Sequence, residues 1–448
     1  MSNWFEDITP ADAIEVFHLN HLYNIDNDEK KVNLTIGAYR TQKNEPFVFP
    51  VVKKAEKIIM NNKVLNYEYL PLSGMVEYNK RCVELLLGCN HPDVVNGCVD
   101  GVQSLGGTGA LRIGMGLLAK LLPNKIIYVP NPTWGNHILI AKDLNYEVRK
   151  YNYYDPDKKS FDYKSMYETL SNAEEGSVVI LHLCAHNPTG FDPSNDRWME
   201  LATIFEKRKI FPLFDAAYPG FASDNYDDDT WAVRYFVQRK IELFCAQSFS
   251  KIFGLYILLY LKHGFKRCKR KYMYLDEHEL QCLHTDYIYI DQRVGNLTYY
   301  CLNFAKCEAI KSMLEYQVRV TVSNCPAFGA QIVSTILSNP SLQEEWRLTL
   351  SQLSANMIEL RILFVNRLRL FIPEMDWDHI AKQKGMFCYS GLPKDVVAHL
   401  REKYHIYMLS SGRISICGLN HDNMRYVIEA IKDTYEYLEH NKTMSIPI

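Results

Sequence analysis

Short apolar runs that end at polar or glycine-bearing loops recur through the middle of the chain. They lie at residues 125–130, 177–184, 210–214 and 241–246, and segments with helical spacing stand between them, among them 198–209 and 231–239. Continuous apolar strands that alternate with amphipathic helices predict a mostly parallel β-sheet covered by helices on both faces. Because ligands gather at the carboxyl ends of strands in such sheets, the polar residues that close these runs are the first place to look for a site.

The C-terminal part has a different pattern. A long stretch with helical periodicity, 343–369, precedes strands expected near 386–389 and 413–417 and then a final helix. We therefore expect an α/β protein in which a smaller α+β domain follows a large domain. The predicted division is 1–45 for an N-terminal arm and part of the small domain, 46–350 for the large domain and 351–448 for the small C-terminal domain.

The bulk composition is that of an ordinary soluble globular protein. Of 448 residues, 47% are hydrophobic and 23% charged, and the formal net charge of −2 favours neither nucleic acid nor an anionic membrane. No stretch reaches the roughly 18 apolar residues of a membrane-spanning helix, and residues 1–10 resemble neither a secretory signal nor a transit peptide. The 12 cysteines are scattered without a Cys-x-x-Cys pair, which favours reduced thiols and a cytoplasmic location and predicts no metal site.

A lysine with two neighbouring hydroxyls follows one of the apolar runs. Ser248, Ser250 and Lys251 stand just after the run 241–246, where a buried ammonium is costly unless it is used or paired. The hydroxyls can hydrogen-bond an anion, and a partly desolvated lysine is a competent amine nucleophile. A Schiff base with a phosphate-bearing carbonyl cofactor fits this composition, and a solvated loop lysine is the alternative.

A glycine-rich run precedes the helical segment 111–122. In Gly106-Gly107-Thr108-Gly109-Ala110, small residues would expose backbone N–H groups at a helix start, where an anion is favoured. The run resembles half of a dinucleotide fingerprint, but neither a preceding strand nor a ribose-binding acid is clear. A structural turn is the alternative.

Two other apolar runs end at polar residues that a cofactor could use. Asp215 ends the run 210–214 with Tyr218 three residues on, and a buried carboxylate there needs a partner such as a pyridinium nitrogen. A helix N-cap aspartate is the alternative. Asn187-Pro188 follows the run 177–184 and predicts a tight turn, a candidate for a cis bond, that aims the amide at a ligand; an ordinary Asn-Pro turn is the alternative.

Two arginines stand in apolar contexts that we interpret as strands. Arg413 follows Ser411-Gly412, and Arg319 lies in the segment 318–321. An arginine in such a place suggests bidentate recognition of a carboxylate. A structural ion pair is the alternative for each.

Taken together, these segments resemble one known family, the aspartate aminotransferases, class I of the fold-type I pyridoxal-phosphate enzymes, and the cytosolic type above all. The resemblance runs from about residue 17 to about residue 437. It rests on VNLTIGAYR at 32–40, NYEYLP at 66–71, GVQSLGGTGALRIG at 101–114, PTW at 132–134, HNPTG at 186–190, CAQSFSKIFG at 245–254 and SGRISICGL at 411–419. It implies a large domain with a mostly parallel seven-stranded sheet and a smaller α+β domain.

The resemblance implies a catalytic role for several matching residues. Lys251 would carry pyridoxal 5′-phosphate as a Schiff base (internal aldimine) and would shuttle the substrate Cα proton. Asp215 would keep the pyridine nitrogen protonated, while Tyr218 and Asn187 would hydrogen-bond the ring's 3′-oxygen. The residues that would pack around the ring are Trp134, stacked on its face, and His137 and His182 behind the pocket.

The same resemblance implies how the phosphate and the substrate are held. The phosphate would contact Gly107, Thr108, Ser248, Ser250, Arg293 and Tyr69 of the partner subunit. Arg413 would bind the substrate α-carboxylate, Arg319 of the partner subunit the distal carboxylate, and Gly37 would line the substrate side. A site built from two chains implies a homodimer.

Two facing arginines select a dicarboxylate, because an uncharged substrate side chain would leave one buried guanidinium unpaired. The expected reaction is therefore transamination of L-aspartate with 2-oxoglutarate to oxaloacetate and L-glutamate. A broader or aromatic specificity is an alternative. A further alternative is a catalytically impaired homologue that acts as a binding or interaction protein.

One segment departs from the family pattern. Residues 257–290 interrupt it with a basic cluster followed by a Tyr-, His- and acid-rich stretch, so that Arg293 stands 42 positions after Lys251. Three interpretations stay open: a surface excursion that leaves the site intact, an insertion that damages cofactor binding, or translated non-coding sequence. The logarithmic rule for loop closure gives an entropic cost of only about 1.5 kcal/mol for such lengthening, so stability alone forbids none of them.

Overall fold

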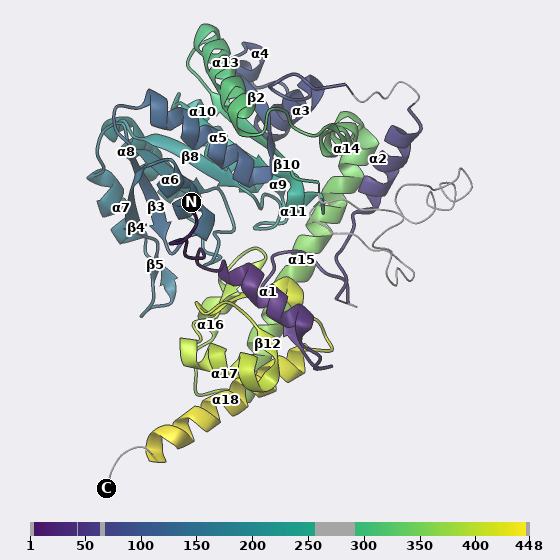
Figure 1. Cartoon of the computed structure of the whole chain (residues 1–448), viewed down its shortest axis with the longest axis vertical. Coiled ribbons are helices and arrows are strands. Elements are labelled where there is room, and N and C mark those ends of the chain that lie inside the picture. The colour runs from purple at the N-terminus through teal and green to yellow at the C-terminus, as the bar shows by residue number, and fades with distance from the viewer. Residues whose placement is uncertain (1–3, 43, 63–67, 256–291, 445–448) are drawn as a thin grey trace.

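A computed structural model describes residues 4–42, 44–62, 68–255 and 292–444 of the chain (Figure 1). Its centre is a seven-stranded sheet in the order β2-β10-β9-β8-β7-β3-β4. The strands are β2 (Val99–Leu105), β3 (Ile126–Asn131), β4 (Glu147–Asn152), β7 (Val178–His182), β8 (Phe211–Ala216), β9 (Leu243–Ser248) and β10 (Val294–Tyr300). Strand β10 is antiparallel to β2 and β9, and the other pairs are parallel. The prediction of a mostly parallel seven-stranded sheet is confirmed.

The four predicted apolar runs form strands β3, β7, β8 and β9, all with buried interiors. In β7, Val178 and Ile180 pack into the core on one face, whereas Val179 and Leu181 pack into the core on the other. Each such apolar side chain contributes about 1.5–3 kcal/mol on full burial. Because both faces are covered, these strands carry unbroken apolar sequence and not the alternation of a half-exposed strand.

Helices cover both faces of the sheet. One core contains residues of α5, α6 and α13, and the other contains residues of α3, α7, α8 and α10. Their bounds are α3 (Val76–Leu87), α5 (Gly106–Leu121), α6 (Gly135–Asp143), α7 (Tyr163–Ser171), α8 (Asn195–Arg208), α10 (Trp231–Gln238) and α13 (Phe304–Thr321). The predicted helices 198–209 and 231–239 are thus confirmed as α8 and α10. The helix expected at 111–122 begins five positions earlier, at Gly106, directly after β2.

A third core lies in the C-terminal part of the chain. It gathers residues of α15, α16, β11, α17, β12, β13 and α18 together with Val32 and Leu34 from the N-terminal segment. The elements are β1 (Val32–Asn33), α15 (Pro340–Phe371), α16 (Asp378–Ala381), β11 (Phe387–Tyr389), α17 (Lys394–Tyr404), β12 (Ile406–Tyr407), β13 (Arg413–Ser415), a 3₁₀ turn (Ile416–Gly418) and α18 (Met424–Met444). Helix α15 runs without interruption through residue 350, from the sheet toward this core (Figure 1). The domain boundaries stay predictions.

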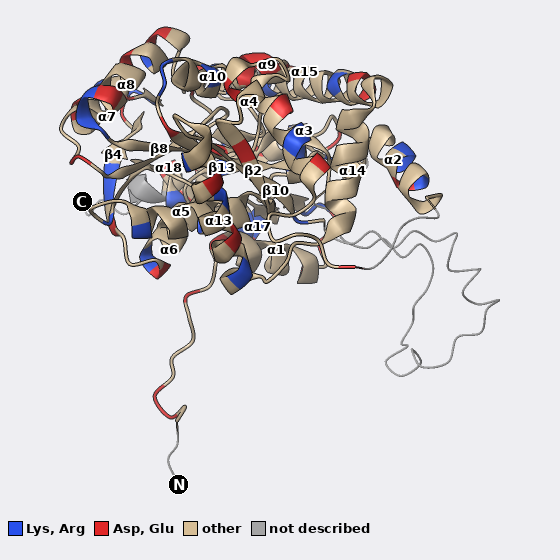
Figure 2. Cartoon of the chain, turned by 90° about the horizontal axis from the view of Figure 1, so that it is seen from above, with Lys and Arg blue, Asp and Glu red and all other residues tan. Residues whose placement is uncertain are grey.

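The remaining elements are α1 (Glu15–Ile25), α2 (Pro50–Met60), α4 (Pro92–Val95), β5 (Tyr154–Asp155), β6 (Ser160–Phe161), α9 (Tyr226–Asp229), α11 (Phe249–Ile252) and α14 (Ala327–Ser338). Of these, α2, α9, α11 and α14 bury residues in a fourth core together with α15. Residues before α1 extend away from the body, and charges of both signs are interspersed (Figure 2). No helix within the described ranges is long and apolar enough to cross a membrane. The segment 257–290 lies outside the described residues.

Candidate active site

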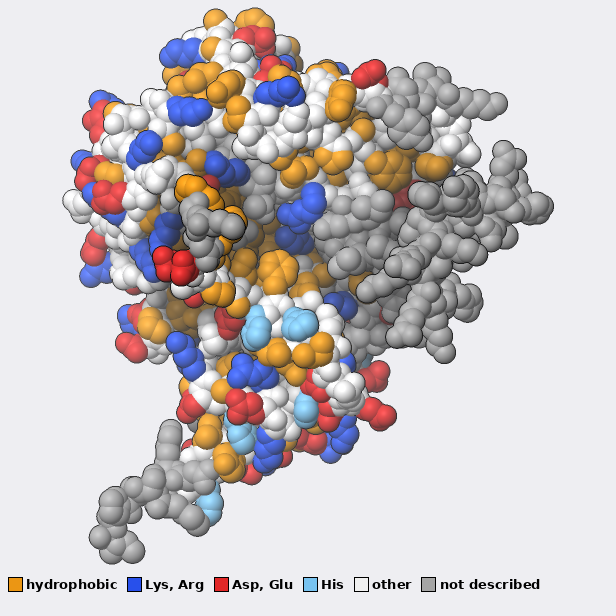
Figure 3. Space-filling view, viewed as in Figure 1, with side chains coloured by type: hydrophobic (Ala, Val, Ile, Leu, Met, Phe, Trp, Pro, Cys, Tyr) orange, Lys and Arg blue, Asp and Glu red, His pale blue; other side chains and the backbone are white. Residues whose placement is uncertain are grey.

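A cavity of about 510 Å³ opens at the carboxyl ends of β7, β8 and β9. Residues of α1 contribute to the lining, and this helix crosses in front of the C-terminal part in Figure 1; Figure 3 shows the side chains on the same face of the molecule. Ten of the predicted site residues line it: Gly107, Thr108, Trp134, Asn187, Asp215, Tyr218, Ser248, Lys251, Arg293 and Arg413. Residues that are far apart in the sequence are therefore brought together in one place.

Lys251 stands on the short helix α11, immediately after the buried strand β9. Its Nζ lies 5.5 Å from the centroid of the Tyr218 ring, and its positive charge helps to lower the pKa of Asp215. The lysine is only partly buried, whereas Phe249, Ser250 and Ile252 around it are buried. The amine is therefore held against a protein wall and faces the cavity, which is the position that a nucleophilic lysine needs.

Asp215, near the end of β8, is buried and accepts a hydrogen bond from Nε2 of His137 at 2.9 Å. Burial raises its pKa, but the hydrogen bond and charge of His137 outweigh burial, so the pKa is lowered overall. Asp215 is therefore a carboxylate at neutral pH. Thr133 Oγ1 contacts His137 Nδ1 at 2.8 Å and His182 Nε2 at 3.4 Å, which fixes both rings behind the carboxylate.

Tyr218 and Asn187 complete this side of the cavity. Burial raises the pKa of Tyr218, although the charge of Arg413 and a hydrogen bond with Asn187 oppose the rise, so its hydroxyl is a neutral donor. The Asn187-Pro188 peptide bond is cis, as the sequence suggested for this turn. The Asn187 amide oxygen in turn accepts from Nη1 of Arg413 at 3.2 Å, which orients the amide.

The N-terminus of α5, a helix of 16 residues, forms the opposite end of the cavity. Gly106 has φ +66°, and a Cβ at Gly107 would stand 3.0 Å from Ser248 Cβ, so the helix start approaches β9 closely. Ser250 Oγ is buried and finds no hydrogen-bond partner in the described part of the chain. Arg293 Nη2 would lie 3.1 Å from a Cβ placed on Gly106. Backbone N–H groups, a hydroxyl and a guanidinium thus converge where an anion is favoured.

Arg413 occupies the start of β13, as expected, and is 7% exposed. Its Nη2 donates to the Thr35 carbonyl oxygen at 2.7 Å, and its guanidinium carbon lies 4.2 Å from the Phe387 ring centroid. Burial lowers its pKa to about 10, so the side chain stays charged at neutral pH. Nε is buried and has no partner among the described residues. Of the five guanidinium N–H groups, two donate to Asn187 and Thr35, so the side chain keeps donors for a ligand carboxylate.

Four predicted site residues do not line this cavity: Ser250, which is buried, and Gly37, Tyr69 and Arg319. A Cβ at Gly37 would meet Phe387 Cζ at 2.4 Å, so Gly37 packs behind the Arg413 wall. Tyr69 is 84% exposed, and Arg319 donates to Ser323 Oγ on the surface. The last two are the residues assigned to the partner subunit. The interpretation of residues around Arg319 as a strand is wrong, because they form the last turn of α13.

His182, which the family resemblance places behind the pocket, also lines the cavity. The other lining residues were not predicted as site residues: Ile14, Glu15, Val16, Phe17, Pro132, Thr133, Gly135, Asn136, Leu139, Pro188, Ala217, Leu409 and Ser411. Pro132 and Thr133 were within reach of the sequence argument, since they belong to the PTW motif. The α1 residues carry no comparable signal, because nothing in the local sequence places them against Arg413.

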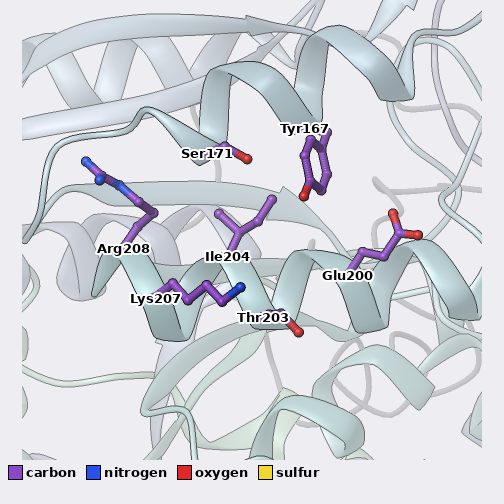
Figure 4. Close-up of a pocket in the computed structure, with 7 residues that line it drawn as sticks. All are labelled: Tyr167, Ser171, Glu200, Thr203, Ile204, Lys207 and Arg208. Atoms are coloured by element: carbon purple, nitrogen blue, oxygen red, sulfur yellow. The ribbon is translucent and has the colours of Figure 1, made fainter.

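A second hollow, of about 220 Å³, lies between α7 and α8 on the outer side of the sheet (Figure 4). Its lining residues are Tyr167, Ser171, Glu200, Thr203, Ile204, Lys207 and Arg208, and no predicted site residue is among them. Within the described ranges, no group of three or more His, Cys, Asp or Glu side chains is placed to hold a metal ion. The predicted site residues therefore converge on the larger cavity and not on this hollow.

This fold and site belong to the aminotransferases: the family profile "Aminotransferase class I and II" matches residues 29–258 and 287–431, and the chain is a member of that family. The chain is 39% identical to the cytoplasmic aspartate aminotransferase of Caenorhabditis elegans over 98% of its length and 100% of that protein, and 39% identical to that of Gallus gallus over 96% and 97%. The break between 258 and 287 falls within the atypical segment.

Solved structures show the same fold. The aspartate aminotransferase from Saccharomyces cerevisiae cytoplasm superposes with a TM-score of 0.87 at 33% identity, covering 97% of this chain and 99% of that one. An aromatic-amino-acid aminotransferase from Burkholderia pseudomallei, covalently bound to pyridoxal phosphate, gives a TM-score of 0.85 at 32% identity, covering 97% and 100%.

Proposed function

We propose that this chain is a pyridoxal-phosphate-dependent aspartate aminotransferase, which exchanges L-aspartate and 2-oxoglutarate for oxaloacetate and L-glutamate. The observation that carries the proposal is the convergence of Lys251, Asp215, Arg293 and Arg413 on one cavity. The relatives from Caenorhabditis elegans and Gallus gallus are both named cytoplasmic aspartate aminotransferase, and we place this chain in the cytoplasm as well.

The residues of the cavity fit the cofactor at both of its ends. The cofactor phosphate needs hydrogen-bond donors that no protein acceptor occupies. The start of α5, the unpartnered Ser250 Oγ and Arg293 supply such donors. Its pyridine nitrogen needs an anion, and Asp215 is one because His137 lowers the pKa of its carboxyl group. Trp134 lines the same cavity and offers a ring face for stacking.

When bound, the cofactor supplies a carbonyl carbon for amines and a ring that takes up the electron pair released at the substrate Cα. Lys251 Nζ is the protein base that would take the Cα proton, since it faces the cavity beside Tyr218. Asp215 would hold a proton on the ring nitrogen. Tyr218, whose pKa is raised by burial, stays a neutral hydroxyl donor throughout.

Arg413, which lines the cavity, would bind the substrate α-carboxylate through guanidinium N–H groups that Asn187 and Thr35 leave unused. Its orientation is set by the Thr35 oxygen and the Phe387 face, so the guanidinium edge is turned to the ligand. For the distal carboxylate we propose Arg319 of the partner subunit, and for the phosphate Tyr69 of the partner subunit as well. Both residues are exposed in the single chain, as residues lent to a second subunit must be. The working unit is then a homodimer with shared sites.

Absorption spectroscopy tests the cofactor and the amine together. The protein with added pyridoxal 5′-phosphate should show the visible band of a lysine-bound cofactor, and the band should bleach on addition of L-aspartate. Lys251→Ala should abolish both the band and oxaloacetate formation, whereas Lys158→Ala, which alters an exposed lysine paired with Asp155, should change neither. A colourless wild type, or full activity in Lys251→Ala, would contradict the proposal.

Subunit mixing tests the shared site. Lys251→Ala and Arg319→Met chains should each be inactive on L-aspartate. Random reassociation of equal amounts should restore about a quarter of wild-type activity, because half of the dimers are hybrids with one intact site. No recovery would mean that Arg319 serves its own chain, and an Arg319→Met enzyme that is active by itself would mean that Arg319 has no role. Turnover of L-phenylalanine above that of L-aspartate would instead favour the aromatic specificity that the name of the Burkholderia enzyme states.

A further inference from the structure

Among the described residues that line the active-site cavity, two are carboxylates, Glu15 and Asp215, and three are cationic, Lys251, Arg293 and Arg413. Asp215 lies in the floor, where it pairs with His137. Glu15 has no part in the proposed reaction. A carboxylate in the lining of this cavity repels the carboxylates of a dicarboxylic substrate. Its presence there therefore calls for an explanation.

A hydrogen bond from the backbone fixes the position of the Glu15 side chain. It stands in the first turn of α1, and its Oε1 accepts from the backbone N–H of Ser410 at 2.6 Å. Ser410 precedes Ser411 and Arg413, which both line the cavity. The negative charge of Glu15 also helps to keep Arg413 protonated. The carboxylate is thus fixed at the mouth, on the side where the α-carboxylate would bind.

The two kinds of substrate carry different charges at that point. An amino-acid substrate has an ammonium group on the carbon next to its α-carboxylate, and L-aspartate has a net charge of −1 at neutral pH. A 2-oxo acid with two carboxylates has no cation and a net charge of −2. A fixed negative charge near Arg413 attracts the ammonium group of the first while repelling the second.

We propose that Glu15 is a specificity-determining residue that favours the amino-acid substrate over the 2-oxo acid by its charge at the mouth of the cavity. This inference rests on the proposed function. Glu15 is exposed, so solvent screens its field and the effect is a bias of a few-fold. Lys251 and Arg293 lie in the same lining but attract the more negative 2-oxo acid more strongly, so they cannot provide this discrimination.

Glu15→Gln removes the charge and keeps an oxygen that can accept from Ser410. At low ionic strength we expect it to lower KM for 2-oxoglutarate about threefold while KM for L-aspartate stays the same or rises slightly. Near 1 M salt, where the Debye length is about 3 Å, the difference from wild type should vanish. Glu29→Gln, on an exposed acid outside the cavity lining, is the matched control and should change neither KM.

A third variant separates charge from attachment. Glu15→Leu removes both the charge and the hydrogen bond to Ser410. If Glu15→Gln leaves both KM values unchanged while Glu15→Leu raises both together, Glu15 is only a structural latch and the proposal is overturned. Equal changes of both KM values in Glu15→Gln would also overturn it. A wild type that neither turns over L-aspartate nor binds 2-oxoglutarate by calorimetry refutes the proposed function itself, and this inference with it.

Discussion

Replacing Arg413 by lysine should weaken catalysis through the α-carboxylate while the protein stays folded. In the wild type, Nη2 donates to Thr35 and Nη1 to Asn187, and each of these nitrogens keeps a second N–H. A lysine ammonium keeps the positive charge, but it is a point donor that cannot hold both protein acceptors and also present a planar pair of donors to a carboxylate. The substituted site therefore loses at least one charged hydrogen bond to the substrate.

The size of the loss follows from that single bond. A hydrogen bond to a charged group contributes about 1.5–3 kcal/mol. Since about 1.36 kcal/mol corresponds to a factor of ten in rate, kcat/KM for L-aspartate should fall about 10- to 150-fold. Because the α-carboxylate is common to all amino acids, the slow reaction with L-alanine should fall by the same factor.

The assay measures initial rates of transamination of both amino acids with 2-oxoglutarate. Wild type and variant are compared at equal content of bound cofactor, judged by its absorption band. Arg369→Lys, in an exposed ion pair with Asp378, is the control and should retain wild-type kinetics. An Arg413→Lys enzyme within about threefold of wild type would refute the reasoning, since a charged hydrogen bond at the lower limit already exceeds that factor. A loss confined to L-aspartate would assign Arg413 to the distal carboxylate instead.

Two further predictions concern stability. In Gly295→Ala, the new Cβ would stand 2.4 Å from the Gly106 carbonyl carbon, so unfolding should become easier by about 1–3 kcal/mol; a thermal melt should show this, whereas Gly135→Ala, with nothing within 4 Å, should not shift the melt. A backbone hydrogen bond from Asp28, above all, lowers the pKa of Asp26 from 3.8 to about 2. Since the folded-state pKa is the lower one, this stabilisation is present above pH 3.8 and is lost as pH falls toward 2. Asp26→Asn should therefore flatten the decline of the urea midpoint across that window, and an unchanged slope would contradict the assignment.

The sequence predicts some strands well and others not at all, and the difference has a physical cause. Strands β3, β7, β8 and β9 are buried on both faces by apolar side chains, so their sequences are continuous apolar runs. Strands β2 and β10 are equally buried but contain Gln103, Asn296 and Thr298 at 1%, 0% and 1% exposure. Polar side chains in a core break the apolar pattern by which strands are recognised.

These buried polar side chains are tolerated because they satisfy one another. Asn296 donates to Asn79 Oδ1 at 3.0 Å, Thr298 donates to Asn296 Oδ1 at 2.8 Å, and Gln247 donates to Thr298 Oγ1 at 2.8 Å. Such pairings join residues distant in the sequence, and no local pattern reveals them. For the same reason the sequence pattern does not reveal the strand before the glycine-rich run, although β2 ends directly before Gly106.

The site divides in a similar way. Lys251, Asp215 and Asn187 could be found from the sequence because each stands at or just past the carboxyl end of a parallel strand, where side chains meet at one edge. Glu15 and Phe387 could not, since their place depends on how the N-terminal segment and the C-terminal core pack against the sheet. A residue whose partner lies in another core leaves no local signature.

The position of Arg293 shows why a long segment before it can leave the cofactor site in place. Two residues later, Gly295 pairs with Ser104 on one side and Ser248 on the other, and it also lies against the backbone of Gly106. The register of β10 is therefore set by β2, β9 and the buried polar contacts, all of which act on residues after Arg293. These contacts place the Arg293 guanidinium at the start of α5, irrespective of how many residues lie between Lys251 and Arg293. Loop-closure entropy rises only logarithmically with length, so neither the contacts of the described flanks nor chain entropy requires Arg293 to leave the cofactor site.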